Sequence, residues 1–187
     1  MPESHFMSEA ARLVTAEELE KFPDDDRRYE LVEGRVICMT PVGFQHGRIV
    51  MQFGSLLHRH VQSRKLGVVM TEVGFKLASD PDTVRAPDIA FIRQDRIPPF
   101  EPRGFWNGPA DLAVEVLSPD DGQPDVRTKI EQYLARGVAL VVVIDPVAET
   151  ATTFRRSAPS ATVHGVEILD LDDVVPGFSC RVEEIFL

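Results

Sequence analysis

One stretch, Val138–Ile144 (VALVVVI), restricts the possible folds more than any other part of the sequence. It is a nearly continuous run of β-branched residues, which is typical of a strand buried on both faces of a sheet. A helical pattern from about Val126 to Arg136 precedes it, and Gly137 separates the two. Further upstream, Asp111–Leu117 has the pattern of another strand. Strand, helix and strand in this order predict a right-handed crossover between parallel strands, and therefore an α/β core.

Patterns of antiparallel hairpins flank this core on both sides, so we expect the sheet to be mixed. A capping box at Thr15 predicts a short helix through Leu19 to Phe22. The other expected elements are a hairpin that turns at Glu33-Gly34, a long helix from Gly43 to Lys65, strands at Val68–Leu77 and Thr83–Ile92, and a closing pair at Thr150–Arg156 and Val163–Leu169.

Length and composition exclude several classes of protein. The 187 residues suit a single domain, which we place at residues 15–187 after a flexible leader at 1–14. The net charge of −10 excludes a module that binds nucleic acid through bulk positive charge. The two cysteines match no zinc motif or disulfide framework, so a cytoplasmic location is expected. No apolar run approaches the ~20 residues of a membrane span, so we expect no membrane association.

Two carboxylates fall where strands are usually apolar. In VRAPDIAFI, strand alternation places Asp88 in one row with Ala90 and Ile92. In DLAVEVL, Glu115 stands inside an otherwise apolar run. An ionised carboxylate buried at such a position costs several kcal/mol unless a cation or hydrogen bonds compensate for it. Taken alone, Asp88 also suits a turn or cap after Pro87.

A lysine and a third acid also fall at inward-facing positions. Lys129 occupies the stripe of the predicted helix that Val126, Ile130 and Tyr133 would turn towards the core. Alternation in RYELVEG allows Glu30 to point inward as well. The residues leave other interpretations open. Lys129 can extend along the helix to solvent, and Glu115 can pair with an arginine such as Arg85 or Arg127.

Two acids, a lysine and a further acid form one coherent chemical set. Two carboxylates can fix a hard divalent ion such as Mg²⁺, with Mn²⁺ as a substitute. Such an ion activates a water and stabilises charge on a phosphate. A lysine can orient or deprotonate the water, or neutralise the developing charge. Phosphodiester hydrolysis requires this combination of groups.

The ordered segments APDIAFI, DLAVEVLSPDD, KIEQYLARGV and VVVIDP resemble the PD-(D/E)XK nuclease superfamily and, more narrowly, the bacterial Uma family of restriction-endonuclease-like proteins. RYELVEGRV followed by GFQHGRI is similar to the opening of that family. The resemblance extends from about Thr15 to Leu187. It implies a restriction-endonuclease-like mixed central β-sheet flanked by helices, with antiparallel hairpins at the edges. It also implies a Mg²⁺-dependent endonuclease that hydrolyses phosphodiester bonds in DNA.

By this resemblance, Asp88 and Glu115 are the metal ligands, Lys129 is the catalytic lysine and Glu30 is the additional acid of the first motif. The sequence departs from the superfamily signature at one point. The lysine usually stands two places after the glutamate, and this chain has Leu117 there. Members of the Uma family are similar in carrying the lysine on the following helix, which fits Lys129.

Other functional assignments stay open at this level. A catalytically weak or inactive nuclease fold that acts as a binding or assembly module is the second hypothesis. His46, on the apolar face of the long helix, suits either a hydrogen-bonded core residue or a functional one. The loop at 93–109 mixes arginines with aromatic residues, so it suits base stacking or the contact of a homodimer.

Overall fold

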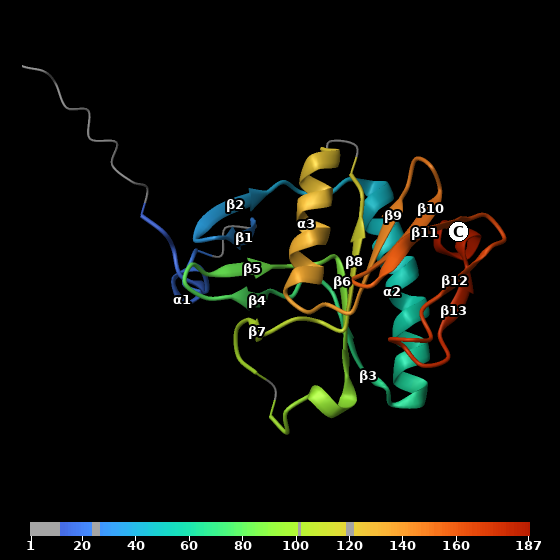
Figure 1. Cartoon of the computed structure of the whole chain (residues 1–187), viewed down its shortest axis with the longest axis horizontal. Helices are drawn as coiled ribbons and strands as arrows, with labels where there is room; N and C mark the ends of the chain where they lie inside the picture. The colour runs from blue at the N-terminus through green and yellow to red at the C-terminus, as the bar shows by residue number, and fades with distance from the viewer. Residues whose placement is uncertain (1–11, 24–26, 101, 119–121) are drawn as a thin grey trace, which may run out of the picture.

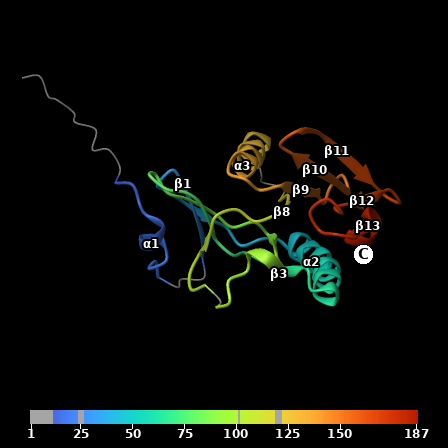
Figure 2. The same cartoon turned by 60° about the horizontal axis from the view of Figure 1, so that its bottom comes forward.

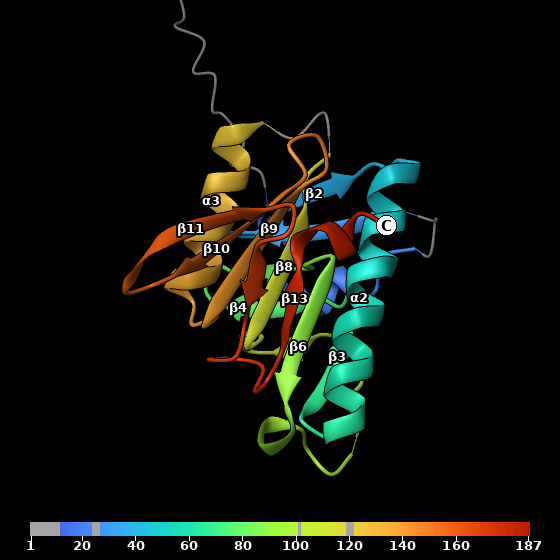
Figure 3. The ribbon, with the colours of Figure 1, turned by 90° about the vertical axis from the view of Figure 1, so that its right-hand side faces the viewer.

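The computed structural model describes residues 12–23, 27–100, 102–118 and 122–187. Within these ranges, a six-stranded sheet with the order β11-β10-β9-β8-β6-β3 forms the centre (Figure 3). Its strands are β3 (Gly67–Met70), β6 (Ile89–Arg93), β8 (Leu112–Val116), β9 (Leu140–Asp145), β10 (Thr150–Arg155) and β11 (Ala158–His164). Strands β8 and β9 run parallel and the other described neighbours run antiparallel. The predicted mixed sheet with a parallel strand–helix–strand unit is therefore confirmed.

A second sheet of five described strands has the order β2-β1-β5-β4-β7 and lies beside the first (Figure 1). Its strands are β1 (Arg28–Val32), β2 (Arg35–Met39), β4 (Phe75–Ala78), β5 (Thr83–Arg85) and β7 (Trp106–Asn107). The remaining elements are α1 (Ala16–Leu19), α2 (Phe44–Arg64), α3 (Gln123–Ala135), the pair β12 (Ile168–Asp170) and β13 (Ser179–Arg181), and 3₁₀ turns at Gln94–Arg96 and Val182–Ile185.

The central sheet is covered by α2 on one face and by α3 on the other (Figure 2). Alternation sorts the side chains of β9 between the two layers. Leu140, Val142 and Ile144 pack in the cluster that contains the α2 residues, whereas Val141 and Val143 pack with α3. The expectation that Val138–Ile144 is buried on both faces is thus confirmed. On β8 the same rule turns Ala113 and Glu115 towards α3.

Two predicted strands are each divided between the two sheets. The expected strand Thr83–Ile92 is in fact β5 in the second sheet and β6 in the central sheet, and Val68–Leu77 is similarly split into β3 and β4. Pro87 lies at the first crossing, where its missing N–H and fixed φ suit a break between strands. The prediction that Asp88 lies in the middle of a strand is therefore wrong, because Asp88 immediately precedes β6.

The closing hairpin also differs from the prediction. Strand β10 pairs with β11, which begins only a few residues later, and β12 pairs with β13. The predicted partner of β10, Val163–Leu169, therefore spans two elements. The capping box at Thr15, the hairpin at Glu33-Gly34 and the long helix are confirmed. Most of the predicted leader, residues 1–11, lies outside the described residues. In the described part of the chain, no helix has the length and apolar character needed to cross a membrane.

Candidate active site

Asp88 and Glu115 are brought together by the ladder between β6 and β8. The register pairs Ile89 with Val114 and Ala90 with Ala113. Extending it by one position sets Asp88 opposite Glu115, and residues opposite one another in an antiparallel pair have Cβ atoms about 4.5–5.5 Å apart. At this position the Asp88 side chain, and not a backbone carbonyl, accepts the Val116 N–H, with Oδ2 at 2.8 Å. The two acids are thus neighbours where the chain returns from the second sheet to the central sheet at β6.

Lys129 reaches Glu115 from α3. Its Nζ donates to Glu115 Oε2 at 2.9 Å, which is the contact that the sequence predicted. Tyr133, one helical turn further along α3, donates its hydroxyl to Glu115 Oε1 at 2.7 Å. Each oxygen of the Glu115 carboxylate therefore has a donor from α3. This contact exists because Glu115 lies on the α3 side of the sheet.

Glu30 joins the cluster from the second sheet. Its Oε1 lies 3.2 Å from the Lys129 Nζ and also accepts the Ala86 N–H at 2.9 Å. Its Oε2 accepts from Arg85 Nη1 at 2.6 Å, so this buried carboxylate is neutralised on both oxygens. The remaining guanidinium donors of Arg85 point to Gln132 Oε1 on α3, at 3.0 and 2.6 Å. One network therefore ties both sheets to α3.

His46 contacts the cluster from the first turn of α2. Its Nε2 lies 3.2 Å from Asp88 Oδ2, and both side chains are buried. Because Oδ2 also receives the Val116 N–H, both described contacts of Asp88 fall on the same oxygen. The contact fixes the orientation of the Asp88 carboxylate, with Oδ1 taking no hydrogen bond from a described residue. His46 is thus a hydrogen-bonded buried residue that also belongs to the site.

The pKa values of the cluster show an unequal distribution of charge. Burial raises the pKa of Glu115 to about 7; the Lys129 charge opposes this rise, and the nearby carboxylates of Asp88 and Glu30 reinforce it. Burial would also raise the pKa of Glu30, but the charges of Lys129 and Arg85 outweigh it, and this pKa is lowered. Burial would lower the pKa of Lys129, yet Glu115 and Glu30 raise it, so the lysine stays charged. Of the two acids that Lys129 contacts, Glu115 is therefore the one whose negative charge is less compensated.

The structure brings all four predicted residues into one cluster, and it adds three that the sequence analysis did not assign to it: Arg85, Gln132 and Tyr133. Tyr133 could have been found from its place on the inward stripe. The proposed alternatives for Glu115 are wrong, because Arg85 pairs with Glu30 and Arg127 pairs with Glu131 on the surface. Asp88 lies in a bend after Pro87, as the turn-or-cap alternative expects, and its side chain also accepts the Val116 N–H and contacts His46.

The donor set fits a hard divalent cation that keeps most of its water. No group of three His, Cys, Asp or Glu side chains in the described residues is arranged as a metal cage. Mg²⁺ does not need one, because it is commonly held by one or two carboxylates and several waters. Asp88 and Glu115 supply two oxygen-bearing groups on neighbouring strands, and a bound cation would offset the burial and the neighbouring carboxylates that raise the pKa of Glu115. These two residues are the ones that would hold such an ion.

The cluster opens into a cleft of about 850 Å³. The cleft lies between the β1–β2 hairpin, the start of α2, and the first turns of α3. Its floor contains Glu30, His46, Asp88, Glu115 and Lys129. A substrate in the cleft would therefore have direct access to the buried acids and the lysine.

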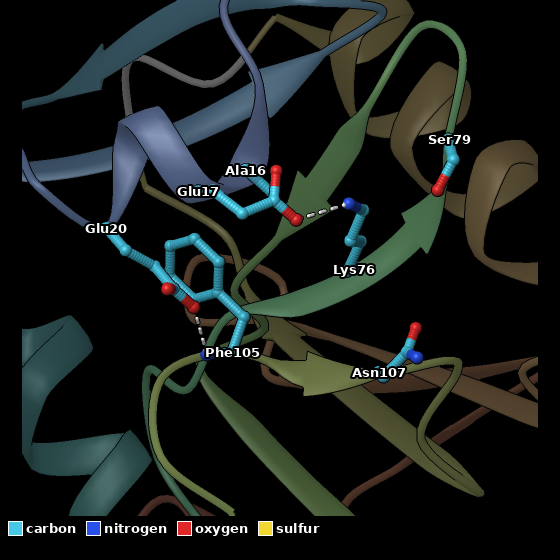
Figure 4. A pocket seen from close by; sticks show the side chains of 7 residues that line it. All are labelled: Ala16, Glu17, Glu20, Lys76, Ser79, Phe105 and Asn107. Carbon is cyan, nitrogen blue, oxygen red and sulfur yellow. Dashed lines mark hydrogen bonds and ion pairs between the residues drawn. The ribbon is translucent and has the colours of Figure 1, made fainter.

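A second, smaller hollow of about 260 Å³ lies on the second sheet (Figure 4). Lys76 lies there between Glu17 Oε1, at 3.0 Å, and Asp82 Oδ2, at 3.1 Å. Glu20 accepts the Phe105 N–H at 2.9 Å. These charged groups tie α1 to the strand β4 and to the loop that follows residue 93, so the hollow has a structural explanation.

The first part of the loop at 93–109, around the 3₁₀ turn Gln94–Arg96, lies far from the cleft. Figure 1 shows this turn at the lower end of the molecule, whereas α2 and α3 begin at the upper end and β7, later in the loop, lies beside β4 in the second sheet. Helix α2 runs from the cleft towards this part of the loop. His46 at the cleft and Arg64 at the far end of the helix are about 27 Å apart, at 1.5 Å per residue. Arg96 is used internally, since it binds Asp111 and the Pro109 carbonyl. Dimerisation through this loop stays a prediction.

Comparisons with known proteins agree with this architecture. The Uma2 family model, described as "Putative restriction endonuclease", matches residues 16–183. The fold is similar to the crystal structure of "a putative nuclease belonging to DUF820" from Anabaena variabilis ATCC 29413, with a TM-score of 0.80 and 22% sequence identity over 92% of this chain and 97% of that one. None of the curated proteins matches the chain. The predicted restriction-endonuclease-like fold is thereby confirmed.

Proposed function

The chain belongs to the Uma2 family, and we propose that it is a metal-dependent nuclease that hydrolyses phosphodiester bonds in DNA. One observation carries the proposal. The Lys129 ammonium is held between the buried carboxylates of Glu115 and Glu30, beside Asp88, at the floor of a cleft. A protein that needed these groups only for stability would gain little from burying them, because buried ion pairs are often no more stabilising than apolar residues of similar volume.

Each residue of the cluster has a distinct role in this proposal. Asp88 and Glu115 hold Mg²⁺, which supplies an activated water and charge stabilisation at the phosphate. Glu115 and Glu30 raise the pKa of Lys129, so the lysine stays protonated. Its positive charge neutralises negative charge that develops on the phosphate. Glu30 holds the lysine in place through the 3.2 Å contact, and Arg85 fixes Glu30 in turn through the 2.6 Å contact. His46 orients the carboxylate of Asp88.

The test is cleavage of labelled DNA in Mg²⁺ or Mn²⁺, with a chelator as the metal-free control. Wild type should cleave with either ion and stop in the chelator. Asp88→Asn should reduce cleavage to background, because it removes a negative ligand while keeping the side-chain shape. Lys76→Met is the matched control, since Lys76 also lies between two acids but outside the cleft, and it should cleave as wild type does.

Two outcomes would overturn the proposal. One is a folded wild type that cleaves no DNA with either ion, which would favour a binding or assembly module on this fold. The other is Asp88→Asn that retains wild-type cleavage. The second result would show that any observed activity arises elsewhere, or from a contaminant.

A further inference from the structure

The cleft has an apolar wall beside the acids, formed by the β1–β2 hairpin. The register pairs Glu30 with Ile37 and Arg28 with Met39, so these side chains share one face of the hairpin. That face lines the cleft. Ile37 is 39% exposed, and so is Val42, which lies in the segment between β2 and α2. Apolar surface is thus available to a ligand directly next to the Glu30 carboxylate.

The opposite side of the cleft continues this apolar character. Leu117, at the end of β8, and Val126, on α3, line it. Both are only partly buried in the α3 core cluster. A ligand that reached Glu115 from the open side would therefore pass between apolar groups from the hairpin and apolar groups from the β8–α3 connection.

The Lys and Arg side chains among the described residues that line the cleft are each paired with an acid. Among the described residues that line it, the basic side chains of Lys and Arg are Arg28, Arg85 and Lys129. Arg28 pairs with Glu72 at 2.6 Å, and the other two pair with Glu30 and Glu115. Surfaces that bind double-stranded DNA are strongly positive, because they neutralise many phosphates of the two backbones. Among its described lining residues, this cleft offers no such surplus of unpaired Lys or Arg, and the chain has a net charge of −10.

We propose that the cleft takes an unpaired nucleotide of a single strand, whose base packs against Ile37, Met39 and Val42 while its phosphate lies at Asp88 and Glu115. The inference rests on the proposed nuclease function and specifies its substrate. In a duplex the faces of the bases are stacked and hidden, so an apolar wall gains nothing from them. An unpaired base exposes an apolar face and carries no unstacking cost. The volume of about 850 Å³ lies within the usual range for a site that encloses a small ligand.

Cleavage rates on matched substrates test the inference. The substrates are a short labelled oligodeoxynucleotide, the blunt duplex of the same sequence, and that duplex with an internal unpaired bubble. The single strand and the bubble should be cut at least about tenfold faster than the blunt duplex, because the duplex must first unstack a base. Cuts in the bubble substrate should fall within its unpaired part. Equal rates on the blunt duplex would overturn the inference and leave the nuclease function intact.

A variant of the wall provides the second test. Ile37→Thr with Met39→Gln keeps β-branching and side-chain length but removes apolar surface. It should raise KM for the single strand roughly tenfold, with kcat and Mn²⁺ affinity near those of wild type. Ile168→Thr is the matched control, because Ile168 is an exposed strand isoleucine away from the cleft, and its KM should not change. An unchanged KM in the double variant would contradict the inference.

A binding measurement separates this inference from the proposed function. Fluorescence anisotropy of the labelled oligonucleotide and of its duplex, in Ca²⁺, reports binding without requiring turnover. Preferential binding of the single strand that the wall variant loses would support the inference even if no cleavage were found, and the nuclease function alone would then fail. Equal affinity for both forms, or a wall variant that binds as wild type does, would overturn the inference.

Discussion

Two lysines in the described part of the chain each lie between two carboxylates, yet their surroundings give these groups different properties. Lys76 lies 3.0 Å from Glu17 and 3.1 Å from Asp82. Lys129 lies 2.9 Å from Glu115 and 3.2 Å from Glu30. The two clusters contain the same kinds of residue, and their N–O distances are nearly the same. They differ in the burial of the acids, since Glu17 is largely exposed whereas Glu115 and Glu30 are buried. They also differ in a third carboxylate, that of Asp88, which acts on Glu115.

The acids around Lys76 are stabilised in their charged form. The backbone N–H of Glu17 and the ammonium of Lys76 lower the pKa of the Glu17 carboxyl, which is largely exposed. The Ala16 N–H and Lys76 outweigh the burial of Asp82 and lower its pKa too. Around Lys129 the result is different, because burial and the additional carboxylate of Asp88 raise the pKa of Glu115 to about 7. The Lys76 cluster therefore keeps both of its acids charged and serves as a structural tie. In the Lys129 cluster the buried Glu115 lies beside a third acid, and one lysine does not fully compensate its negative charge.

The largest effect that separates the two clusters should come from Lys129→Met. This change keeps most of the bulk of the side chain and removes the charge, so cleavage should fall by about 10²–10³-fold, as for the loss of a single electrostatic donor. Metal binding should remain, since Lys129 is not a ligand. Lys129→Arg should not restore full activity, because a planar guanidinium does not replace a compact ammonium. The measurement is the single-turnover cleavage rate in Mg²⁺.

Circular dichroism provides the control for folding of these variants. If folded Lys129→Met cleaved at the wild-type rate, the lysine would be a structural partner of Glu115, as Lys76 is of Glu17. The contrast between the clusters would then have no functional meaning.

The second effect is a difference in pH dependence. In the folded protein, burial raises the pKa of Glu115 from 4.5 to about 7. Between these values the folded state binds more protons than the unfolded state, so the free energy of unfolding of the metal-free protein should fall as pH rises. The fall attributable to Glu115 is on the order of 3 kcal/mol, and Glu115→Gln should lack it. Urea unfolding at a series of pH values measures it. Parallel curves for the two proteins would show that burial does not disfavour the Glu115 charge.

The smallest effect should come from Lys76→Met. The Lys76–Glu17 pair is largely exposed on the Glu17 side and contributes little, and the buried Asp82 keeps the hydrogen bond from the Ala16 N–H when Lys76 is lost. The Tm should therefore fall by less than about 3 °C. Cleavage and metal affinity should not change. Differential scanning calorimetry and the DNA assay check this. A loss of activity comparable to that of Lys129→Met would mean that the Lys76 cluster also takes part in function.

The sequence predicted most of what depends on local pattern. The buried strand that became β9 and the inward-facing Lys129 were predicted because hydrophobic periodicity fixes the face on which a residue lies. Asp88 was predicted as a site residue from one continuous strand that the structure divides into β5 and β6, since alternation does not show that Pro87 marks a passage between two sheets. Arg85 was considered only as a partner of Glu115. Its contact with Gln132 was missed because the two meet only when the second sheet packs against α3, and no local pattern encodes that contact.

We propose that Asp88 and Glu115 form a binding site for a divalent cation, whereas the Lys76 cluster does not. Calorimetric titration of Mn²⁺ into the metal-free protein tests this most directly. Wild type and Lys76→Met should bind with the same affinity, and binding should be lost in Asp88→Asn and in Glu115→Gln. Folded variants of Asp88 and Glu115 that bind Mn²⁺ as wild type does, or a wild type that binds none, would contradict the claim.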